Sequence, residues 1–114
     1  MIIVPHGVRF SIDTKVEDLS GNPSSIIVMS LFRIYKESLA NAIKHAKAKE
    51  VNVFFGVGEG KAVLEVRDNG IGLDGKRGSG RGLPNMKSRA AEIGGSLAIM
   101  SENGTRVRLE FPLP

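Results

Sequence analysis

The chain has 114 residues and a mass of 12.2 kDa, with a formal net charge of +4 and an isoelectric point near 9.7. This length allows one domain with one modest hydrophobic core, so we expect residues 1–114 to form a single domain. No apolar run approaches the roughly 20 residues of a membrane span, and the start, Met1–Pro5, lacks a signal-peptide pattern. The sequence therefore predicts a soluble, cytoplasmic domain without direct membrane contact.

Cysteine is absent, which excludes disulfides, thiolate metal sites and cysteine nucleophiles. Only two histidines are present, which argues against a histidine-rich metal site. The positive charge permits an anionic partner, either nucleic acid or a phosphorylated small molecule. One tyrosine and no tryptophan make a poor platform for stacking bases, so no nucleic-acid partner is expected.

The first half of the chain predicts a strand followed by a long helix. Val8–Asp13 alternates apolar and polar residues and indicates a short strand. Ser24 or Ser25 can cap a helix in which apolar residues recur at helical spacing as far as Ile43. Because its first half is apolar on nearly every side, we expect this helix to be largely buried.

A hairpin and a glycine-rich segment follow. Val51–Val57 and Ala62–Arg67 are predicted antiparallel strands joined by a turn at Gly58–Lys61. Residues 70–82 contain six glycines and little apolar surface, which predicts a mobile loop or lid.

The C-terminal part predicts a second helix and a second hairpin. Leu83–Ile93 has helical spacing and ends at a Gly-Gly pair, and strands are expected at Leu97–Met100 and Thr105–Phe111. The order of elements predicts an α+β fold, a two-layer sandwich with a mixed, mostly antiparallel sheet and helices on one face. Charged residues alternate along the strands and should line the other face: Lys61, Glu65, Arg67, Arg106, Arg108 and Glu110.

Asp68 stands where the second predicted strand ends, followed closely by Gly70 and Gly72. Such glycines let a flat ligand approach the backbone, and a strand fixes the direction of its last side chain. The alternative is an ordinary turn, since Asp-Asn-Gly is a common turn sequence. Taken alone, the segment favours the turn.

A polar group lies on the first helix. Glu37, Asn41, Lys44 and His45 follow one another at spacings of four, three and one, so Glu37, Asn41 and one of the last two share a face. The alternative is the solvated side of an amphipathic helix. Asn41 is a poor helix former, however, and its amide oxygen is a suitable Mg²⁺ ligand.

The segment Gly78–Leu83 directly precedes the second helix, where free backbone N–H groups attract anions. By itself it is equally well explained as a flexible surface loop. Taken with Asp68 and Asn41, it completes an acidic anchor, a metal ligand and an anion-binding loop. This combination fits a nucleoside triphosphate bound through Mg²⁺.

These residues also carry a resemblance. Residues 33–46 resemble the N box of histidine kinases, residues 68–72 resemble the G1 box, and residues 80–83 resemble the G2 box. The chain is thus similar to the catalytic ATP-binding domain (Bergerat fold) of sensor histidine kinases of the GHKL superfamily. Residues 82–90, with Gly94-Gly95 and Gly104-Thr105, are most similar to the nitrate- and desaturase-sensor type.

The resemblance implies roles for individual residues. Asp68 would accept a hydrogen bond from the adenine amino group, Asn41 would bind Mg²⁺, and Lys44 would neutralise phosphate charge. Glu37 matches an acidic residue that activates water or orients the acceptor histidine, and which of the two it does stays open. The remaining implied ATP-binding residues are His45, Gly70, Gly72, Gly80, Arg81, Gly82, Leu83 and Thr105, although His45 is equally well explained as a surface residue at the helix end.

The phosphoacceptor is missing, because neither His6 nor His45 has the family's acceptor setting. We therefore expect ATP·Mg²⁺ to bind here and its γ-phosphoryl to pass to a histidine on a separate dimerisation domain of the same kinase, with a response regulator downstream. The parent protein could be membrane-anchored elsewhere. Two alternatives stay open, a serine kinase of the anti-sigma-factor type and a non-catalytic ATP-sensing module. The resemblance implies no role for residues 1–22.

Overall fold

The structure is a computed structural model that describes residues 7–17, 25–45, 47–71, 82–101 and 103–112. All of the predicted strands and helices are present, with ends shifted by a few residues. In chain order they are β1 (Arg9–Val16), α1 (Ser25–Ala40), the π-helical turn η1 (Asn41–His45), β2 (Glu50–Gly58), β3 (Lys61–Asp68), α2 (Gly82–Glu92), β4 (Ser96–Ser101) and β5 (Thr105–Pro112).

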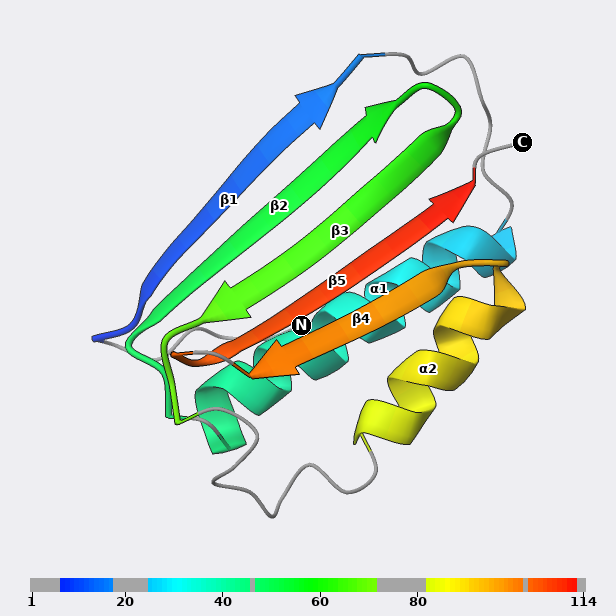
Figure 1. Cartoon of the computed structure of the whole chain (residues 1–114). Coiled ribbons are helices and arrows are strands. Elements are labelled where there is room, and N and C mark those ends of the chain that lie inside the picture. The colour runs from blue at the N-terminus through cyan, green and yellow to red at the C-terminus, as the bar shows by residue number, and fades with distance from the viewer. Residues whose placement is uncertain (1–6, 18–24, 46, 72–81, 102, 113–114) are drawn as a thin grey trace.

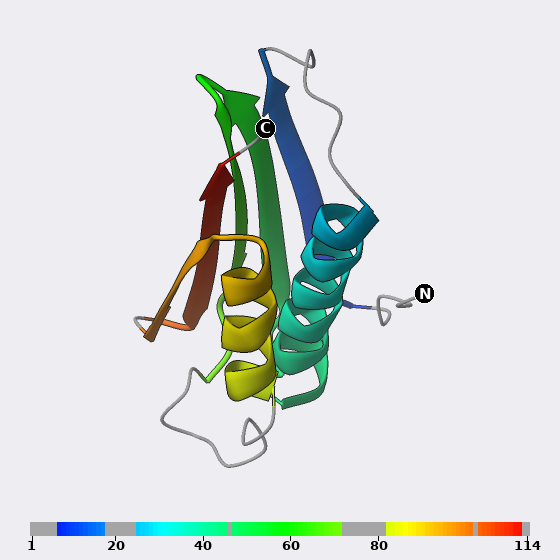
Figure 2. The same ribbon diagram turned by 90° about the vertical axis from the view of Figure 1, so that its right-hand side faces the viewer.

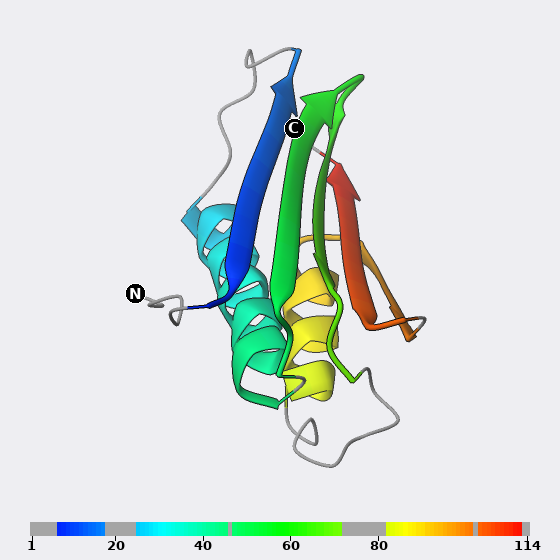
Figure 3. The same ribbon diagram turned by 90° about the vertical axis from the view of Figure 1, so that its left-hand side faces the viewer.

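The five strands form one sheet in the order β1-β2-β3-β5-β4. β1 and β2 are parallel, as expected for strands joined through a helix, and the other three pairs are antiparallel. Both helices lie on the same face of the sheet and pack against each other (Figures 1, 2 and 3). The predicted α+β class, with a mixed sheet covered on one face, is confirmed.

The core lies between the sheet and the two helices. Alternation along the strands turns Val53, Val66 and Val107, which are opposite one another, toward the helices, and all three are buried. Ile34 of α1 and Met86 of α2 fill the layer from the other side and are almost fully buried. The charged residues predicted for the open face alternate with this core set, so that prediction is confirmed as well.

Local turn chemistry fixes two of the connections. Glu59 and Gly60 join β2 to β3 with φ values of 53° and 77°, the pattern of a two-residue type I′ hairpin. α2 stops where Gly94 takes a φ of 70°, and the N–H of Gly95 donates to the carbonyl of Ala90 at 2.8 Å. These glycines confirm the predicted stop.

The prediction that α1 is largely buried is wrong for its first half. Four large apolar side chains of that half are exposed: Ile26, Val28, Met29 and Phe32. A helix that packs on one sheet face and one neighbouring helix can bury only one side, however apolar its sequence is. The predicted lid lies mostly outside the described residues. Within the described residues, no helix is long and apolar enough to cross a membrane.

Candidate functional site

The predicted site segments meet at one end of the molecule. The end of β3, the start of β5, the turn η1 and the start of α2 all lie at this end in the three views (Figures 1, 2 and 3). The strand register brings two of these segments together, because Asp68 at the end of β3 is opposite Thr105 at the start of β5. Residues separated by 37 positions in sequence are thereby neighbours.

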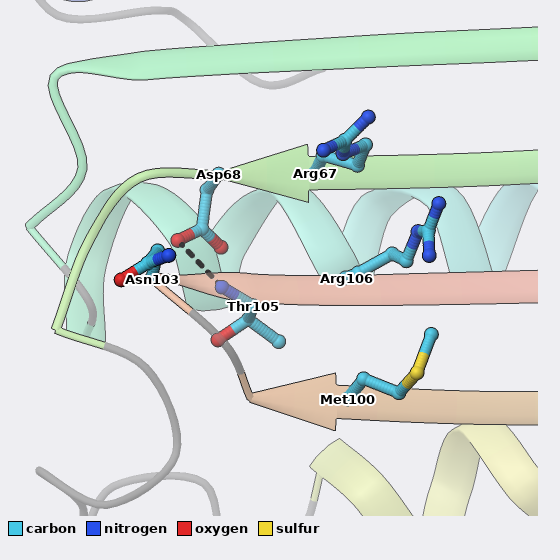
Figure 4. Close-up of a pocket in the computed structure, with 6 residues that line it drawn as sticks. All are labelled: Arg67, Asp68, Met100, Asn103, Thr105 and Arg106. Carbon is cyan, nitrogen blue, oxygen red and sulfur yellow. Dashed lines mark hydrogen bonds between the residues drawn. The ribbon is translucent and has the colours of Figure 1, made fainter.

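Asp68 is held by the backbone through one carboxylate oxygen. Its Oδ1 accepts hydrogen bonds from the N–H of Gly70 at 2.8 Å and from the N–H of Thr105 at 3.3 Å (Figure 4). Burial raises the pKa of this carboxyl above its ordinary value, and the two backbone hydrogen bonds act in the opposite direction. Oδ2 takes no part in these bonds, so it is the oxygen from which a ligand could be recognised.

Asn69 was predicted only as part of the G1 resemblance, with no role of its own. Its side-chain Oδ1 accepts hydrogen bonds from the N–H groups of Lys49 and Glu50, both at 2.9 Å. Its own N–H donates to the carbonyl of Glu50 at 3.2 Å. Asn69 therefore fastens the turn after β3 to the start of β2. The sequence contains no signal for this, since the donors are two consecutive backbone groups 20 and 19 residues away.

The turn between β4 and β5 contacts the same backbone from the other side. Gly104 is buried and has a φ of 124°, and a Cβ added there would lie 1.9 Å from the carbonyl oxygen of Asp68. Any side chain at this position would collide with the backbone of β3. Glycine at 104 thus permits the close approach that brings the N–H of Thr105 to Asp68.

The end of the first helix departs from the predicted geometry. Glu37 and Asn41 are both half-buried, but the residues from Asn41 to His45 form a π-helical turn. A π turn advances each residue by a smaller angle than an α-helix does, so the predicted face that includes Lys44 or His45 does not follow from α-helical spacing. Such turns are frequent at functional sites. The side chains of Lys44 and His45 lie outside the described part of the structure.

Ser38 connects this helix to the second one. Its hydroxyl donates to the carbonyl of Ile34 at 2.8 Å and lies 3.4 Å from the sulfur of Met86 on α2. Both Ser38 and Met86 are buried. This contact sets the spacing of α1 and α2 one turn before Asn41.

Several predicted site residues cannot be placed. Gly72, Gly80 and Arg81 lie outside the described residues. Gly82 and Leu83 belong to the first turn of α2, but their side-chain environment is not described. The anion-binding role of this helix start therefore stays a prediction.

A pocket of about 200 Å³ opens beside Asp68 at the end of the sheet (Figure 4). The ends of β3, β4 and β5 and the β4–β5 turn contribute its walls, which are Arg67, Asp68, Met100, Asn103, Thr105 and Arg106. Asp68 and Thr105 belong to the strand positions that turn toward the helices, whereas Arg67, Met100 and Arg106 belong to the alternate positions on the open face. The pocket therefore spans both sides of the sheet end.

A divalent cation would find few protein ligands here. Among the described residues, no group of three acidic or histidine side chains could hold a metal ion. The half-buried amide of Asn41 forms no hydrogen bond to another described residue. This donor set fits Mg²⁺ that is held mainly by phosphate oxygens and water, with one amide from the protein.

These features define a two-layer α+β domain with a candidate ligand site at one end of its sheet. The chain matches the model of the family described as histidine kinase-, DNA gyrase B- and HSP90-like ATPase over residues 27–114. The chain belongs to this family of ATPases, which implies ATP as its nucleotide.

Similar curated proteins are sensor kinases. The chain is 41% identical to the sensor histidine kinase LiaS of Bacillus subtilis over 74% of this chain and 24% of LiaS. It is 31% identical to the histidine-protein kinase/phosphatase UhpB of Salmonella typhimurium over 98% of this chain and 22% of UhpB, and 37% identical to the sensor protein VraS of Staphylococcus aureus over 73% of this chain and 25% of VraS. The chain spans about a quarter of the length of these relatives.

Solved structures confirm the fold. The catalytic domain of histidine kinase ThkA superposes with a TM-score of 0.73 at 19% identity, covering 93% of this chain and 78% of that one. The ATP-binding domain of PrrB from Mycobacterium tuberculosis gives a TM-score of 0.72 at 24% identity, covering 97% and 84%.

Proposed function

We propose that this domain binds ATP·Mg²⁺ and donates the γ-phosphoryl group to a histidine on a separate dimerisation domain of the same sensor kinase, which is of the nitrate- and desaturase-sensor type. The phosphoryl group would then pass to a response regulator. The observation that carries the proposal is the fixed carboxylate of Asp68. Its Oδ1 accepts two backbone hydrogen bonds, which orients Oδ2 as an acceptor for the adenine amino group.

This arrangement discriminates between purines. Adenine presents an amino group, which is a donor, where guanine presents a carbonyl oxygen, which is an acceptor. A carboxylate oxygen can only accept a hydrogen bond, so guanine would place two acceptors against each other. The site should therefore reject GTP, because a mismatched buried polar group costs about 1–3 kcal/mol.

We assign the phosphate groups of ATP to the turn η1 after α1 and to the start of α2. Asn41 on the π turn would supply the amide ligand to Mg²⁺, which when bound neutralises phosphate charge. Lys44 would add positive charge, and Gly80, Arg81 and Gly82 would approach the phosphates at the start of α2. Glu37 lies one helical turn before Asn41, where it would either activate water or orient the acceptor histidine. Phosphoryl transfer needs mainly positioning and charge, which such residues can provide.

The curated relatives support this assignment, since LiaS is a sensor histidine kinase and UhpB a histidine-protein kinase/phosphatase. Their additional length leaves room for the dimerisation domain and for a membrane anchor in the parent protein. Within this proposal, the present domain supplies ATP binding and the phosphoryl group but not the acceptor.

The test is a reconstituted transfer reaction. The domain is mixed with the separately expressed dimerisation domain of its parent protein and radiolabelled ATP, with and without Mg²⁺. We expect Mg²⁺-dependent label on the dimerisation domain that is lost in acid, as phosphohistidine is, and that is absent with Asn41→Ala. Acid-stable label would instead identify a serine kinase. Tight ATP binding with no transfer would identify an ATP-sensing module, and no ATP binding would overturn the proposal entirely.

A further inference from the structure

The open face of the sheet carries two arginines in an unusual arrangement. Arg67 on β3 and Arg106 on β5 are directly opposite each other in the antiparallel register, so both side chains stand on the same face. Both line the pocket beside Asp68 (Figure 4). Like charges in directly opposite positions destabilise a strand pair, so the fold tolerates an unfavourable contact at this point.

The neighbouring carboxylate neutralises only part of this charge. Glu65 is 8% exposed, and its Oε1 lies 3.3 Å from Nε of Arg106 and 3.1 Å from a terminal nitrogen of Arg108. Arg108 also pairs with Glu110 at 3.2 Å. One buried carboxylate oxygen is therefore shared by two guanidinium groups.

Arg67 and Arg106 both have unused donors. Within the described part of the chain, the Arg67 side chain forms neither a salt bridge nor a hydrogen bond, and it is exposed. Nε of Arg106 is buried, and its contact with Glu65 lacks hydrogen-bond geometry, so among the described residues it has no hydrogen-bond partner. Glu65 thus holds the Arg106 side chain in place without using its terminal nitrogens.

The pocket offers further polar groups at suitable places. Asn103 forms part of the wall, with a φ of 54° in the tight turn beside Thr105. The carboxylate of Asp68 belongs to the opposite side of the sheet and is engaged by backbone N–H groups through Oδ1. On the open face, the pocket therefore presents the donors of two guanidinium groups, and the Asn103 amide lies elsewhere in its wall.

We propose that this open-face pocket is an oxyanion site in which Arg67 and Arg106 bind a phosphate or carboxylate group. Guanidinium groups bind both kinds of anion in bidentate geometry, and an anion between the two arginines would remove the repulsion across β3 and β5. A volume of about 200 Å³ admits one such group. The pocket is shared with Asp68 and Thr105, which the proposed function assigns to ATP, but Arg67 and Arg106 stand on the face of the sheet away from α1 and η1, so the anion is tested without nucleotide.

The test measures stabilisation by anions without nucleotide. Unfolding midpoints of the whole chain are recorded against inorganic phosphate, and separately against a short peptide of glutamates, with chloride adjusted to constant ionic strength. We expect a saturable rise in the midpoint with at least one of them. A ligand that binds only the native state produces such a rise, and the stronger of the two ligands identifies the anion's source.

Substitutions inside and outside the pocket distinguish a specific anion site from a general effect of net charge. Arg67→Gln should lower the affinity for the anion at least about tenfold, since it removes a charge-assisted pair of hydrogen bonds. Lys61→Gln, on the same strand and face but outside the pocket, makes the same charge change and should leave the affinity unchanged. Asn41→Ala should also leave it unchanged, which separates this site from the nucleotide phosphates.

Three results would overturn the proposal. They are the absence of a saturable rise in the native chain, an unaltered affinity in Arg67→Gln, and an equal loss in Lys61→Gln. The last would reduce the effect to net charge. If Arg106→Gln folds poorly because Glu65 loses a partner, Arg67→Gln still decides, and the amide chemical shifts of Met100 and Asn103 under phosphate titration give an independent reading.

Discussion

Replacing Asp68 with asparagine separates ligand recognition from folding. Oδ1 of Asp68 accepts the N–H groups of Gly70 and Thr105, and the amide oxygen of an asparagine can accept both in the same way. The change is confined to the other oxygen, which becomes an NH₂ group. A donor would then face the adenine amino group, which is also a donor. Asp68→Asn should therefore bind ATP poorly while keeping the fold.

The expected loss can be estimated. A buried donor left without an acceptor costs about 1–3 kcal/mol, and a central value of about 2 kcal/mol corresponds to a dissociation constant raised about 30-fold. Calorimetric titration with ATP and Mg²⁺ measures this directly. Asp13→Asn is the matched control, because Asp13 is an exposed carboxylate on the edge strand β1 and its substitution makes the same charge change. Its affinity should stay within about twofold of the native value.

The reasoning is refuted if Asp68→Asn folds normally and its ATP affinity changes by less than about threefold, which is roughly 0.65 kcal/mol. Such a result would mean that Oδ2 is not the adenine acceptor. Equal losses in Asp68→Asn and Asp13→Asn would point instead to a general effect of net charge.

Four further outcomes follow from the same geometry. Because burial raises the pKa of Asp68, protonation of this carboxyl adds to the free energy of unfolding. This added stability is fully present below about pH 3.9 and is lost as the pH rises through the raised pKa. Urea unfolding across this range should show the loss in the native chain and not in Asp68→Asn. Asn69→Ala removes two hydrogen bonds that anchor the backbone and should lower the melting temperature by about 8 °C. Asn69→Asp retains an acceptor oxygen and should keep most of the native melting temperature. Equal melting temperatures for the two variants would contradict the fastening role of Asn69. Gly104→Ala should destabilise the domain by at least about 2 kcal/mol in chemical unfolding, since its Cβ collides with Asp68, and a smaller effect would show that the turn can move. Glu59→Asn should stabilise it by about 0.5–1 kcal/mol without altering ATP affinity, because asparagine tolerates the positive φ of the turn, and Glu59→Gln, the control, should be neutral.

The elements governed by local rules were predictable from the sequence. Alternation identified β3 and β5, and the glycines after α2 marked its end, because side-chain period and backbone freedom are properties of a few consecutive residues. The sequence resemblance predicts both Asp68 and Thr105 as site residues. Their hydrogen bond followed only once the sheet order placed β5 beside β3.

Features created by tertiary contact were not predictable. The π turn at Asn41 breaks the α-helical spacing on which the shared face with Lys44 or His45 depended. Apolar residues such as Phe32 satisfied a pattern for burial, but the sequence does not reveal that only one side of α1 has a partner. The role of Asn69 depends on two backbone N–H groups that carry no sequence signature. In each case the missing information was the position of a distant segment.

The hydrophobic core fixes the candidate site through strand register. Asp68 is opposite Val51 on β2 and Thr105 on β5, while two positions earlier Val66 is opposite Val53 and Val107 in the core. A slip of one residue in β5 would turn its buried residues to the open face and place Gly104 or Arg106 opposite Asp68, so burial of the core strongly disfavours it. The strand end that carries the carboxylate is therefore positioned by apolar contacts, and the turns beside it orient the carboxylate through the N–H groups of Gly70 and Thr105. A short Asp-Asn-Gly turn by itself predicts no site. The strand register explains why the aspartate of this turn nevertheless has an acceptor oxygen in a fixed position.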